Sequence, residues 1–446
     1  MNYSCDFTSL IKDGNVFLFA LMHGCEGQDK KLRMQTEARW LHPLDDVATA
    51  LRGLRADDTV PVASGGLARQ IRLTGDIPAG HKFAVRSLGA GLRIRKYGEF
   101  IGRLTQDVEE GAHVHLHNLE TCARKKVTDG ADWLDRIEAT PAFEVLGESR
   151  TFVGESPLWD ETTGRFYWID VRDRPRIFML EANASRETVW PMAEDVGTVV
   201  LGEGGKLLAA LRSGFAWFDP ADGSLDPILN PEADLPGNRM NDGKCDAAGR
   251  FWCGSMNPET GLAEGNFYRL DADLSCERLF GGLYTPNGPS WSPDGRTFYL
   301  ADTRQGTIFA FDCDPQTGQL GERRVFADLG ALPGGPDGAA IDAEGCLWSA
   351  QFGGGCLIRY TPDGTIDRVI RMPVGKPASV AFGGEGYRRL FVTTASRGMT
   401  EAQLAAESLA GRVLVMDVGV AGLPPARFRA KHGLAKVQTA TGREVA

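Results

Sequence analysis

The chain repeats one short phrase six times, a turn glycine followed by a strand of aromatic or branched residues: Gly164-Arg-Phe-Tyr-Trp168, Gly205-Lys-Leu-Leu208, Gly249-Arg-Phe-Trp252, Gly295-Arg-Thr-Phe-Tyr299, Gly345-Cys-Leu-Trp348 and a degraded copy, Gly386-Tyr-Arg-Arg-Leu-Phe391. Consecutive glycines lie 41, 44, 46, 50 and 41 positions apart. A period of about 40–50 residues is typical of one four-stranded propeller blade. The repeat therefore predicts a mainly β fold with a six-bladed propeller over residues 145–425. The alternative is an ordinary β-sandwich with glycine turns, although sandwiches do not usually repeat at this length.

The residues before the repeat differ in pattern and predict a small β-rich domain over residues 41–122. Leu44–Leu54 has apolar residues at helical spacing behind Asp45 and Asp46, which predicts a short amphipathic helix. Short β runs follow, separated by glycine and proline: Thr59–Val62, Ile71–Leu73, Ala84–Ser87, Leu92–Tyr97 and His113–His117. We expect a polar, helical linker over residues 123–144, extending to about 147. An N-terminal extension, 1–40, and a basic tail, 426–446, stay unassigned.

Length and composition set the class of protein. The chain has 446 residues, of which 42% are apolar, so it can bury more than one domain core. Its longest apolar stretch, Val16–Met22, is far shorter than the ~20 residues that a membrane-spanning helix needs. The nine cysteines are scattered and form no C-x-x-C pair, which favours a reducing cytoplasm. Residues 151–446 hold 29 Lys and Arg against 38 Asp and Glu, an acidic balance that argues against nucleic acid as a partner.

The distribution of histidine limits the chemistry of the repeats. Six of the seven histidines lie at or before His117, and the seventh is His432 in the tail. The repeats therefore hold neither a Ser-His-Asp triad nor a histidine-rich zinc site of their own. The local signatures of a phosphate-binding loop, a nucleophile elbow and a zincin helix are also missing.

Side chains with carboxylate or amide groups remain as candidates for chemistry in the repeats. Four of them recur at matching places ahead of the repeat phrase: Glu155, Asn241, Asn287 and Asp337. Because the inner strands of a propeller converge on one channel, these groups can meet at one mouth. Two carboxylates with amide oxygens suit calcium, magnesium or manganese, and zinc stays possible. The alternative is that Asn-Gly and Asp-Gly merely form hairpin turns.

Four separated motifs resemble the senescence marker protein/gluconolactonase family, which includes regucalcin, over residues 145–425. They are Gly154-Glu155-Ser-Pro-Leu-Trp, the run from Asn238 to Trp252, Pro286-Asn287-Gly-Pro-Ser-Trp-Ser-Pro-Asp-Gly, and Pro336-Asp337-Gly-Ala-Ala-Ile-Asp-Ala-Glu-Gly. The resemblance implies one divalent metal (calcium, zinc, manganese, magnesium or ferrous iron) held by Glu155, Asn287 and Asp337. Pro289 and Ala339 depart from the family, which usually has bulky apolar residues there, so the pocket wall is expected to differ.

The same resemblance implies how the site works. Asp337 would also be the general base, while Arg239, Asn241 and Glu259 would contact the substrate. A cation bound to a lactone carbonyl acts as a Lewis acid, and a carboxylate beside it takes a proton from the attacking water. We therefore expect a lactone-opening hydrolase that makes a sugar acid.

The front domain resembles the small SAF (β-clip) domain of altronate and galactarate dehydratases. The phrases that carry the likeness are Leu41–Leu51, Ile77-Pro-Ala-Gly-His81-Lys-Phe-Ala, Ile94-Arg-Lys-Tyr-Gly-Glu-Phe-Ile-Gly and His113-Val-His115-Leu-His117-Asn118. On a strand, His113, His115 and His117 would share one face and could hold a transition metal or an anionic sugar acid. A solvated polar strand face is the alternative.

The fusion suggests consecutive steps in uronate or aldarate breakdown, by association rather than from a site. Our first hypothesis is a cytoplasmic, metal-dependent hydrolase of an aldono- or aldarolactone. The second is a non-catalytic scaffold that binds metal or sugar acid and recruits a sugar-acid dehydratase large subunit. A third, weaker reading is an esterase or phosphotriesterase. Neither nucleic acid nor a membrane is expected as a partner.

Overall fold

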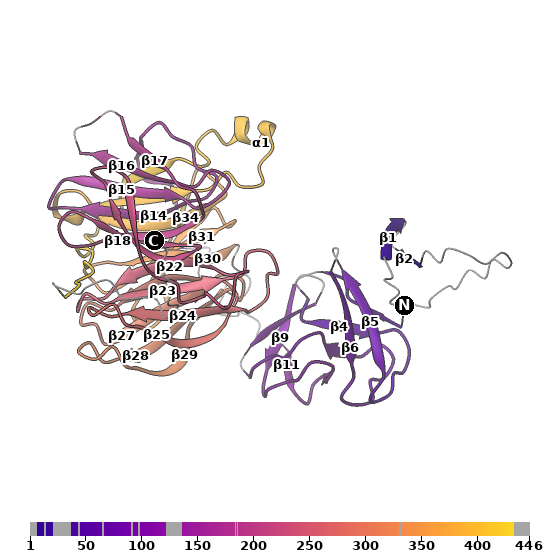
Figure 1. Cartoon of the computed structure of the whole chain (residues 1–446). Helices are drawn as coiled ribbons and strands as arrows, with labels where there is room; N and C mark the ends of the chain where they lie inside the picture. Colours follow the sequence, from indigo (N-terminus) through magenta and orange to yellow (C-terminus); the bar gives the residue numbers. More distant parts are fainter. Residues whose placement is uncertain are drawn as a thin grey trace, which may run out of the picture. The chain divides into compact units, whose positions relative to one another are not determined.

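The computed structural model describes residues 7–12, 15–20, 37–42, 45–64, 67–90, 92–96, 99–121, 136–182, 184, 186–329, 332 and 334–431. They fall into two compact units, a front unit that ends near Leu119 and a second unit that follows it. Strands dominate both units (Figure 1). None of the described helices has the length and apolar character needed to cross a bilayer.

The front unit consists of short strands in small sheets. One four-stranded sheet has the order β10 (His113–Val114), β7 (Lys82–Ala84), β4 (Val47–Ala50) and β3 (Ala38–Arg39). A three-stranded sheet has the order β11 (Leu119–Thr121), β9 (Glu99–Leu104) and β8 (Arg93–Lys96). Two further antiparallel pairs are β5 (Thr59–Ser64) with β6 (Leu67–Arg72), and β1 (Phe7–Lys12) with β2 (Asn15–Ala20). Trp40, Val60, Ile71 and Phe83 are among the buried core residues.

Two expectations for the front unit are wrong. The helix predicted over residues 44–54 is absent, and strand β4 occupies its centre between β3 and β7. The sheet buries Val47, Ala48 and Ala50 but leaves Leu51 48% exposed, so tertiary pairing overrides the helical spacing. The predicted strand over His113–His117 stops after Val114, and a turn follows. The other expected β runs correspond to β5, β6, β7 and β8, with shifted ends.

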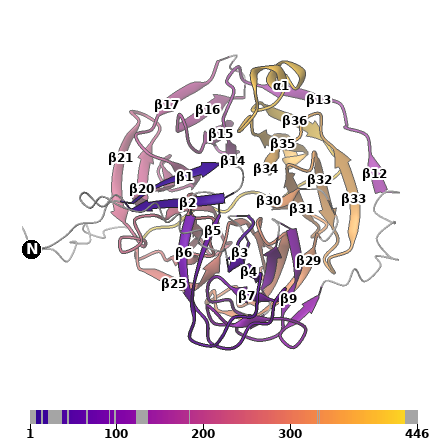
Figure 2. The same cartoon turned by 90° about the vertical axis from the view of Figure 1, so that its right-hand side faces the viewer.

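The second unit is a six-bladed propeller, which confirms the predicted architecture. Its first three blades are β14 (Gly154–Asp160), β15 (Arg165–Asp170), β16 (Arg176–Glu181), β17 (Thr188–Pro191); β18 (Val196–Leu201), β19 (Leu207–Leu211), β20 (Gly214–Asp219), β21 (Ser224–Leu229); and β22 (Arg239–Cys245), β23 (Phe251–Met256), β24 (Gly265–Leu270), β25 (Cys276–Leu283). In Figure 2 the inner strands β14, β30 and β34 lie near the centre, and outer strands such as β17, β21 and β33 lie at the rim.

The other three blades have the same strand order from inside to outside, and the sixth also carries two short helices in its loops. They are β26 (Pro286–Trp291), β27 (Thr297–Asp302), β28 (Thr307–Cys313), β29 (Leu320–Asp328); β30 (Gly335–Ile341), β31 (Leu347–Phe352), β32 (Cys356–Tyr360), β33 (Ile366–Arg371); and β34 (Pro377–Gly383), β35 (Arg389–Thr394), β36 (Val413–Asp417). The 3-10 helix η2 (Glu385–Tyr387) and the helix α1 (Glu401–Ala406) lie in the loops of the sixth blade.

Strands that precede the first blade complete the last two blades. β13 (Phe143–Leu146) pairs antiparallel with β36, and β12 (Ile137–Glu138) pairs parallel with β33. Each inner strand contacts the next one, and β34 contacts β14, so the ring is closed. The helical linker that we expected is therefore not formed at residues 137–138 and 143–146, because these residues extend sheet edges instead. Residues 123–135 lie outside the described part of the chain.

The repeated glycines explain the repeat. Each lies in the turn that joins the inner strand of a blade to its second strand, and each has a positive φ: Gly164, Gly205, Gly249, Gly295, Gly345 and Gly386. An L side chain rarely adopts this conformation, so the turn selects glycine. The described part of the tail, residues 426–431, lies against the turns of the first three blades: Arg427 donates to Thr162, the buried Phe428 donates its N–H to Leu201 O, and Arg429 donates its N–H to Gly249 O.

Candidate active site

The six inner strands are all irregular near their first residues. The pairing of each inner strand with its neighbour shifts register within β14, β18, β22, β26, β30 and β34. Such bulges change the direction of side chains and are frequent beside active sites. Glu155, Asn287 and Asp337 lie at these shifts in β14, β26 and β30. The Asn-Gly and Asp-Gly pairs are therefore parts of bulged inner strands rather than hairpin turns.

Close packing between inner strands explains the glycines that follow Asn287 and Asp337. A Cβ added to Gly288 would lie 2.8 Å from both the backbone oxygen of Asp337 and the Cβ of Ala339. A Cβ on Gly338 would lie 2.0 Å from Oγ of Ser379. The glycines therefore let the fourth, fifth and sixth blades approach one another closely at this end of the channel.

Three carboxylates from three blades interact electrostatically at this end. Burial raises the pKa of Glu155 well above its ordinary range, and the charges of Asp337 and Asp242 raise it further. Burial and the charge of Asp242 likewise raise the pKa of Asp337. Burial also raises the pKa of Asp242, against the lowering effect of Lys244. The fold therefore brings these three carboxylates close together, and a bound cation would reduce the repulsion between them.

A chain of hydrogen bonds fixes the amide of Asn287. Its Oδ1 accepts a 2.7 Å bond from Nδ2 of Asn241, and its Nδ2 donates a 2.7 Å bond to Oγ1 of Thr303. Thr303 in turn donates to the backbone oxygen of Pro336, at 2.7 Å. Asn241 also donates to the backbone oxygen of Pro286. Both amides are buried, and the amide oxygen of Asn287 is kept on the side of Asn241.

Asp242 and Lys244 connect the third blade to its neighbours. Asp242 accepts 2.8 Å hydrogen bonds from the backbone N–H groups of Gly243 and Gly288. Lys244 donates from Nζ to the backbone oxygen of Ala339, at 2.6 Å. Burial lowers the pKa of Lys244, while the nearby Asp242 raises it. These two residues therefore hold the inner strands β22, β26 and β30 in place around the carboxylates.

Arg239 brings a buried positive charge to the same end of the channel. Burial lowers its pKa to about 10, and the charges of Arg172 and Arg212 add to the effect, whereas Asp195 opposes it. Its Nη1 donates to the backbone oxygen of Met240, and its Nε has no hydrogen-bond partner, the nearest carboxylate oxygen, on Asp195, being 3.9 Å away. Buried N–H groups without a partner are rare in folded proteins, so this one is available to the oxygen of a bound molecule.

Loops between second and third strands add more arginines at this end, because strand order places these loops beside the starts of the inner strands. Arg172, Arg212 and Arg304 lie on such loops in the first, second and fourth blades. Arg212 pairs with Asp195 at 3.1 Å, and Arg304 donates to the backbone oxygen of Gly261. The predicted substrate residue Glu259 is exposed on the matching loop of the third blade and pairs with Arg172 at 3.2 Å.

The donor set fits a hard divalent cation. Glu155 and Asp337 would supply carboxylate oxygens, Asn287 would supply an amide oxygen, and Asp242 would add a further negative charge beside them. Oxygen ligands of this kind are those of calcium, magnesium and manganese. Sequence reasoning singled out the first three residues but missed Asp242, Lys244 and Thr303. Asp242 and Lys244 lie in the same Asn-Asp-Gly-Lys phrase as Asn241, whereas no local pattern marks Thr303.

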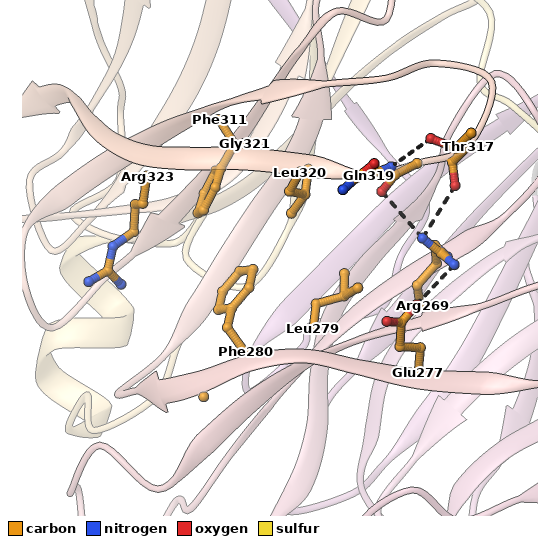
Figure 3. A pocket seen from close by; sticks show the side chains of 12 residues that line it. Arg269, Glu277, Leu279, Phe280, Phe311, Thr317, Gln319, Leu320, Gly321 and Arg323 are labelled. Atoms are coloured by element: carbon orange, nitrogen blue, oxygen red, sulfur yellow. Dashed lines mark hydrogen bonds and ion pairs between the residues drawn. The ribbon is translucent and has the colours of Figure 1, made fainter.

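A surface groove elsewhere on the propeller lacks these properties. It is a surface groove of about 700 Å³ between the third and fourth blades, lined by residues such as Leu279, Phe280 and Phe311 (Figure 3). Arg269 and Glu277 pair within it at 3.0 Å, and the rings of Phe280 and Phe311 stack. No buried, clustered carboxylate lines this groove, so the channel end is the better candidate for chemistry.

The three predicted histidines of the front unit lie together, and a fourth joins them. The rings of His113 and His115 have centroids 5.5 Å apart, and those of His113 and His117 are 5.3 Å apart. His81, which the sequence analysis did not select, stacks on His115 at 4.4 Å. Burial is the first cause that lowers the pKa values of His113 and His115, followed by neighbouring positive groups.

The described propeller is a six-bladed one that gathers carboxylate and amide side chains of several blades at one end of a channel free of histidine. Residues 153–396 match the SMP-30/gluconolactonase/LRE-like family, and the chain belongs to this family. Residues 37–122 match the altronate/galactarate dehydratase SAF domain. Both family resemblances seen in the sequence are thereby confirmed.

Three relatives illustrate the match. The chain is 37% identical to an L-arabinolactonase of Azospirillum brasilense, over 66% of this chain and 98% of that protein. It is 35% identical to a 6-deoxy-6-sulfogluconolactonase of Pseudomonas putida, over 60% of this chain and 92% of the relative. The solved structure of a calcium-binding protein, regucalcin, from Agrobacterium tumefaciens is similar with a TM-score of 0.63 and 30% identity, over 66% of this chain and 99% of that one. These relatives support sugar-lactone hydrolysis as the activity of this enzyme.

Proposed function

We propose that the propeller hydrolyses a sugar lactone to the open-chain sugar acid, with a divalent cation held by Glu155, Asn287 and Asp337. The observation that carries the proposal is that carboxylates from three blades, Asp337 buried and Glu155 and Asp242 half-buried, act on one another beside an amide whose oxygen is oriented by hydrogen bonds. The names of the lactonase relatives agree with this chemistry.

The chain's own residues have distinct roles in this proposal. The cation, when bound, supplies Lewis-acid polarisation of the lactone carbonyl. Asp337 accepts a proton from the attacking water and returns it to the ring oxygen as the carbon–oxygen bond breaks, so that lactone and water give one hydroxy acid. Arg239 orients a substrate oxygen, because its buried Nε has no hydrogen-bond partner. Asn241 already donates both of its amide hydrogens to Pro286 and Asn287, so it orients a substrate hydroxyl through its amide oxygen.

The arginines at the channel end favour a lactone that carries a negative group. Arg172, Arg212, Arg239 and Arg304 lie there, and together with Lys244 and the bound divalent cation they outweigh Asp195, Glu259 and the clustered carboxylates of Glu155, Asp242 and Asp337, although the whole chain has a net charge of −10. Carboxylates bind guanidinium groups in a bidentate manner. We therefore infer that an aldarolactone or a similar acidic sugar lactone is a better substrate than a neutral aldonolactone.

A panel of lactones tests both statements. Chelator-treated protein is assayed on neutral and acidic sugar lactones, without metal and with calcium, zinc, manganese, magnesium or ferrous iron. We expect hydrolysis only with metal, and a loss of about 10³-fold in kcat/KM for Asp337→Asn and Glu155→Gln. Asp294→Asn, at an exposed turn on the opposite end of β26, is the matched control. Full activity of either site variant would refute the assignment.

The SAF match supports a second candidate function, the recruitment of a dehydratase subunit. Its dehydratase namesakes act on sugar acids, the product class proposed here, so the front unit could recruit a sugar-acid dehydratase large subunit in uronate or aldarate breakdown. A protein that binds calcium or a sugar acid but never accelerates lactone opening over buffer would favour this scaffold role alone.

A further inference from the structure

Four imidazoles form one cluster on the front unit: His81, His113, His115 and His117. Ring centroids are 4.4 Å apart for His81 and His115, 5.1 Å for His81 and His113, and 5.3–5.5 Å for the remaining neighbours. Nδ1 of His81 and Nε2 of His113 are 2.9 Å apart and share a hydrogen bond. Side chains of one titratable type, gathered this closely, repel one another whenever they are charged.

The backbone holds this cluster by a short strand and a clamped turn. Strand β10 pairs with β7 in the register His113 to Phe83 and Val114 to Lys82, which brings His115 opposite His81. Asn118 is 3% exposed, accepts a hydrogen bond from the backbone N–H of His115 and donates one to the backbone oxygen of His113. The buried side chain of Asn118 thus stabilises the turn that carries His115 and His117.

Among the described residues, the groups with the largest electrostatic effect on the cluster are nitrogen groups. The charged groups that act on His113 and His115 are the other histidines of the cluster and Lys82. Imidazole is the preferred protein ligand of borderline first-row transition ions such as zinc, nickel and copper, whereas calcium and magnesium require oxygen ligands. The ligand chemistry here is therefore different from that of the propeller.

We propose that the imidazoles of His81, His113, His115 and His117 form a transition-metal site, separate from the oxygen-lined site of the propeller. Among the described residues, no three side chains of the metal-ligating types already surround a shared point. Binding therefore requires the imidazole rings to turn and exchange the bond between His81 and His113 for bonds to the metal. His81, His113 and His115 are only half-buried and His117 is exposed, so their torsions can change without repacking the core.

Zinc binding to the full-length, chelator-treated protein tests this proposal. Because zinc can also occupy the propeller site, equilibrium dialysis is performed on wild type, Glu155→Gln, and His81→Gln/His115→Gln. We expect two equivalents for wild type and one for each of the other two proteins, with an affinity loss at the front site of at least ~100-fold in the histidine variant. Cobalt in place of zinc would give visible absorption that the histidine variant lacks.

Two further variants keep the result decisive. His117→Gln changes an exposed side chain, so it should fold as wild type does and weaken the front site roughly 10-fold or more. Leu116→Gln, at a neighbouring residue that is 71% exposed, is the control and should retain two equivalents. A zinc stoichiometry and affinity that are the same in wild type and in His81→Gln/His115→Gln would overturn the proposal, whereas a single wild-type equivalent that this variant loses and Glu155→Gln keeps would still support it.

Discussion

At the scale of single residues, the candidate site depends on groups that hold the ligands as much as on the ligands. Asn287 can face a cation with its oxygen only if its amide nitrogen is bonded elsewhere, and Thr303 accepts that bond at 2.7 Å. Partners of this kind orient metal ligands, and their removal commonly weakens metal binding 10- to 100-fold. Thr303 is thus a positioning residue, remote in sequence from every ligand.

Removal of this hydroxyl is the first prediction. Thr303→Val leaves the amide nitrogen of Asn287 without an acceptor, so we expect calcium affinity to fall about 10- to 100-fold while thermal stability changes little. Calorimetric titration with calcium measures the effect. Thr303→Ser, which keeps the hydroxyl, should bind nearly as wild type does, and equal losses in both variants would show that the hydroxyl is not the cause.

The pH dependence of stability is the second prediction. Burial and like charges raise the pKa of Glu155 in the folded, metal-free protein above its value in the unfolded chain. The folded state then binds the Glu155 proton more tightly than the unfolded chain does. The contribution of this proton to the free energy of unfolding is fully present below pH ~4, and it is lost as the pH rises through the raised pKa. Denaturant unfolding of metal-free protein between pH 4 and 8 should show this fall, and calcium should reduce it.

Glu155→Gln is the control for that experiment, because it removes the titrating group without changing its size. The difference in unfolding free energy between wild type and this variant should become less favourable to wild type as the pH rises. A difference that stays constant with pH would contradict the raised pKa.

At the scale of elements, each inner strand has two ends with different tasks. On β30, Asp337 lies at the bulge near the channel end. Just past the other end, fully buried Asp342 accepts hydrogen bonds from the indole N–H of Trp348 and from Nε of Arg359, both at 2.8–2.9 Å. Asp246 accepts the indole N–H of Trp252 in the same way. One end of the strand thus serves chemistry, and the other end anchors the turn to its blade.

This division gives the third prediction. Asp342→Ala leaves Trp348 Nε1 without its acceptor and Arg359 without its most buried carboxylate, so it should lower the free energy of unfolding by about 3 kcal/mol. The kcat of the folded enzyme at 25 °C should stay near that of wild type. Urea denaturation and a lactone assay on the same sample measure both. Asp337→Asn should lower kcat while leaving the free energy of unfolding near that of wild type. A similar loss of activity in both variants would contradict the separate roles of the two strand ends.

The same scale shows what the sequence could and could not predict. The repeated glycines predicted the blades because each turn needs a positive φ, a property of the local chain. Val47–Ala50 was misjudged because pairing with two neighbouring strands, not local spacing, determines its conformation. Glu155, Asn287 and Asp337 could be selected from their repeated phase, whereas Thr303 and His81 act through contacts across the fold that leave no periodic trace in the sequence.

At the scale of the whole molecule, closure of the ring depends on residues that precede the first blade. β13 forms the outer strand of the sixth blade, next to β36. Phe143 and Leu146 pack against the cores of the adjoining blades, and Glu138 pairs with Arg368 at 2.7 Å. These residues therefore connect the start of the propeller sequence to its last two blades.

Shortened chains give the fourth prediction. A chain that begins at Arg136 keeps β12 and β13 and should retain lactone hydrolysis. A chain that begins at Glu148 loses the two residues of β12 and the four of β13, three packed apolar side chains (Ile137, Phe143 and Leu146) and the ion pair of Glu138, which should reduce stability by roughly 5 kcal/mol. Differential scanning calorimetry compares the two. Equal melting temperatures would show that the ring does not need this closing strand.

Titration of chelator-treated, full-length protein with calcium, with lactone hydrolysis followed at each addition, tests most directly whether oxygens of three blades form one catalytic ion site. Calcium is the right probe because a histidine cluster does not supply the oxygens that it needs. Activity should rise from the buffer rate to a plateau at one equivalent in wild type and stay at the buffer rate in Glu155→Gln. Full hydrolysis by the metal-free protein, or an unchanged titration curve in Glu155→Gln, would contradict the account.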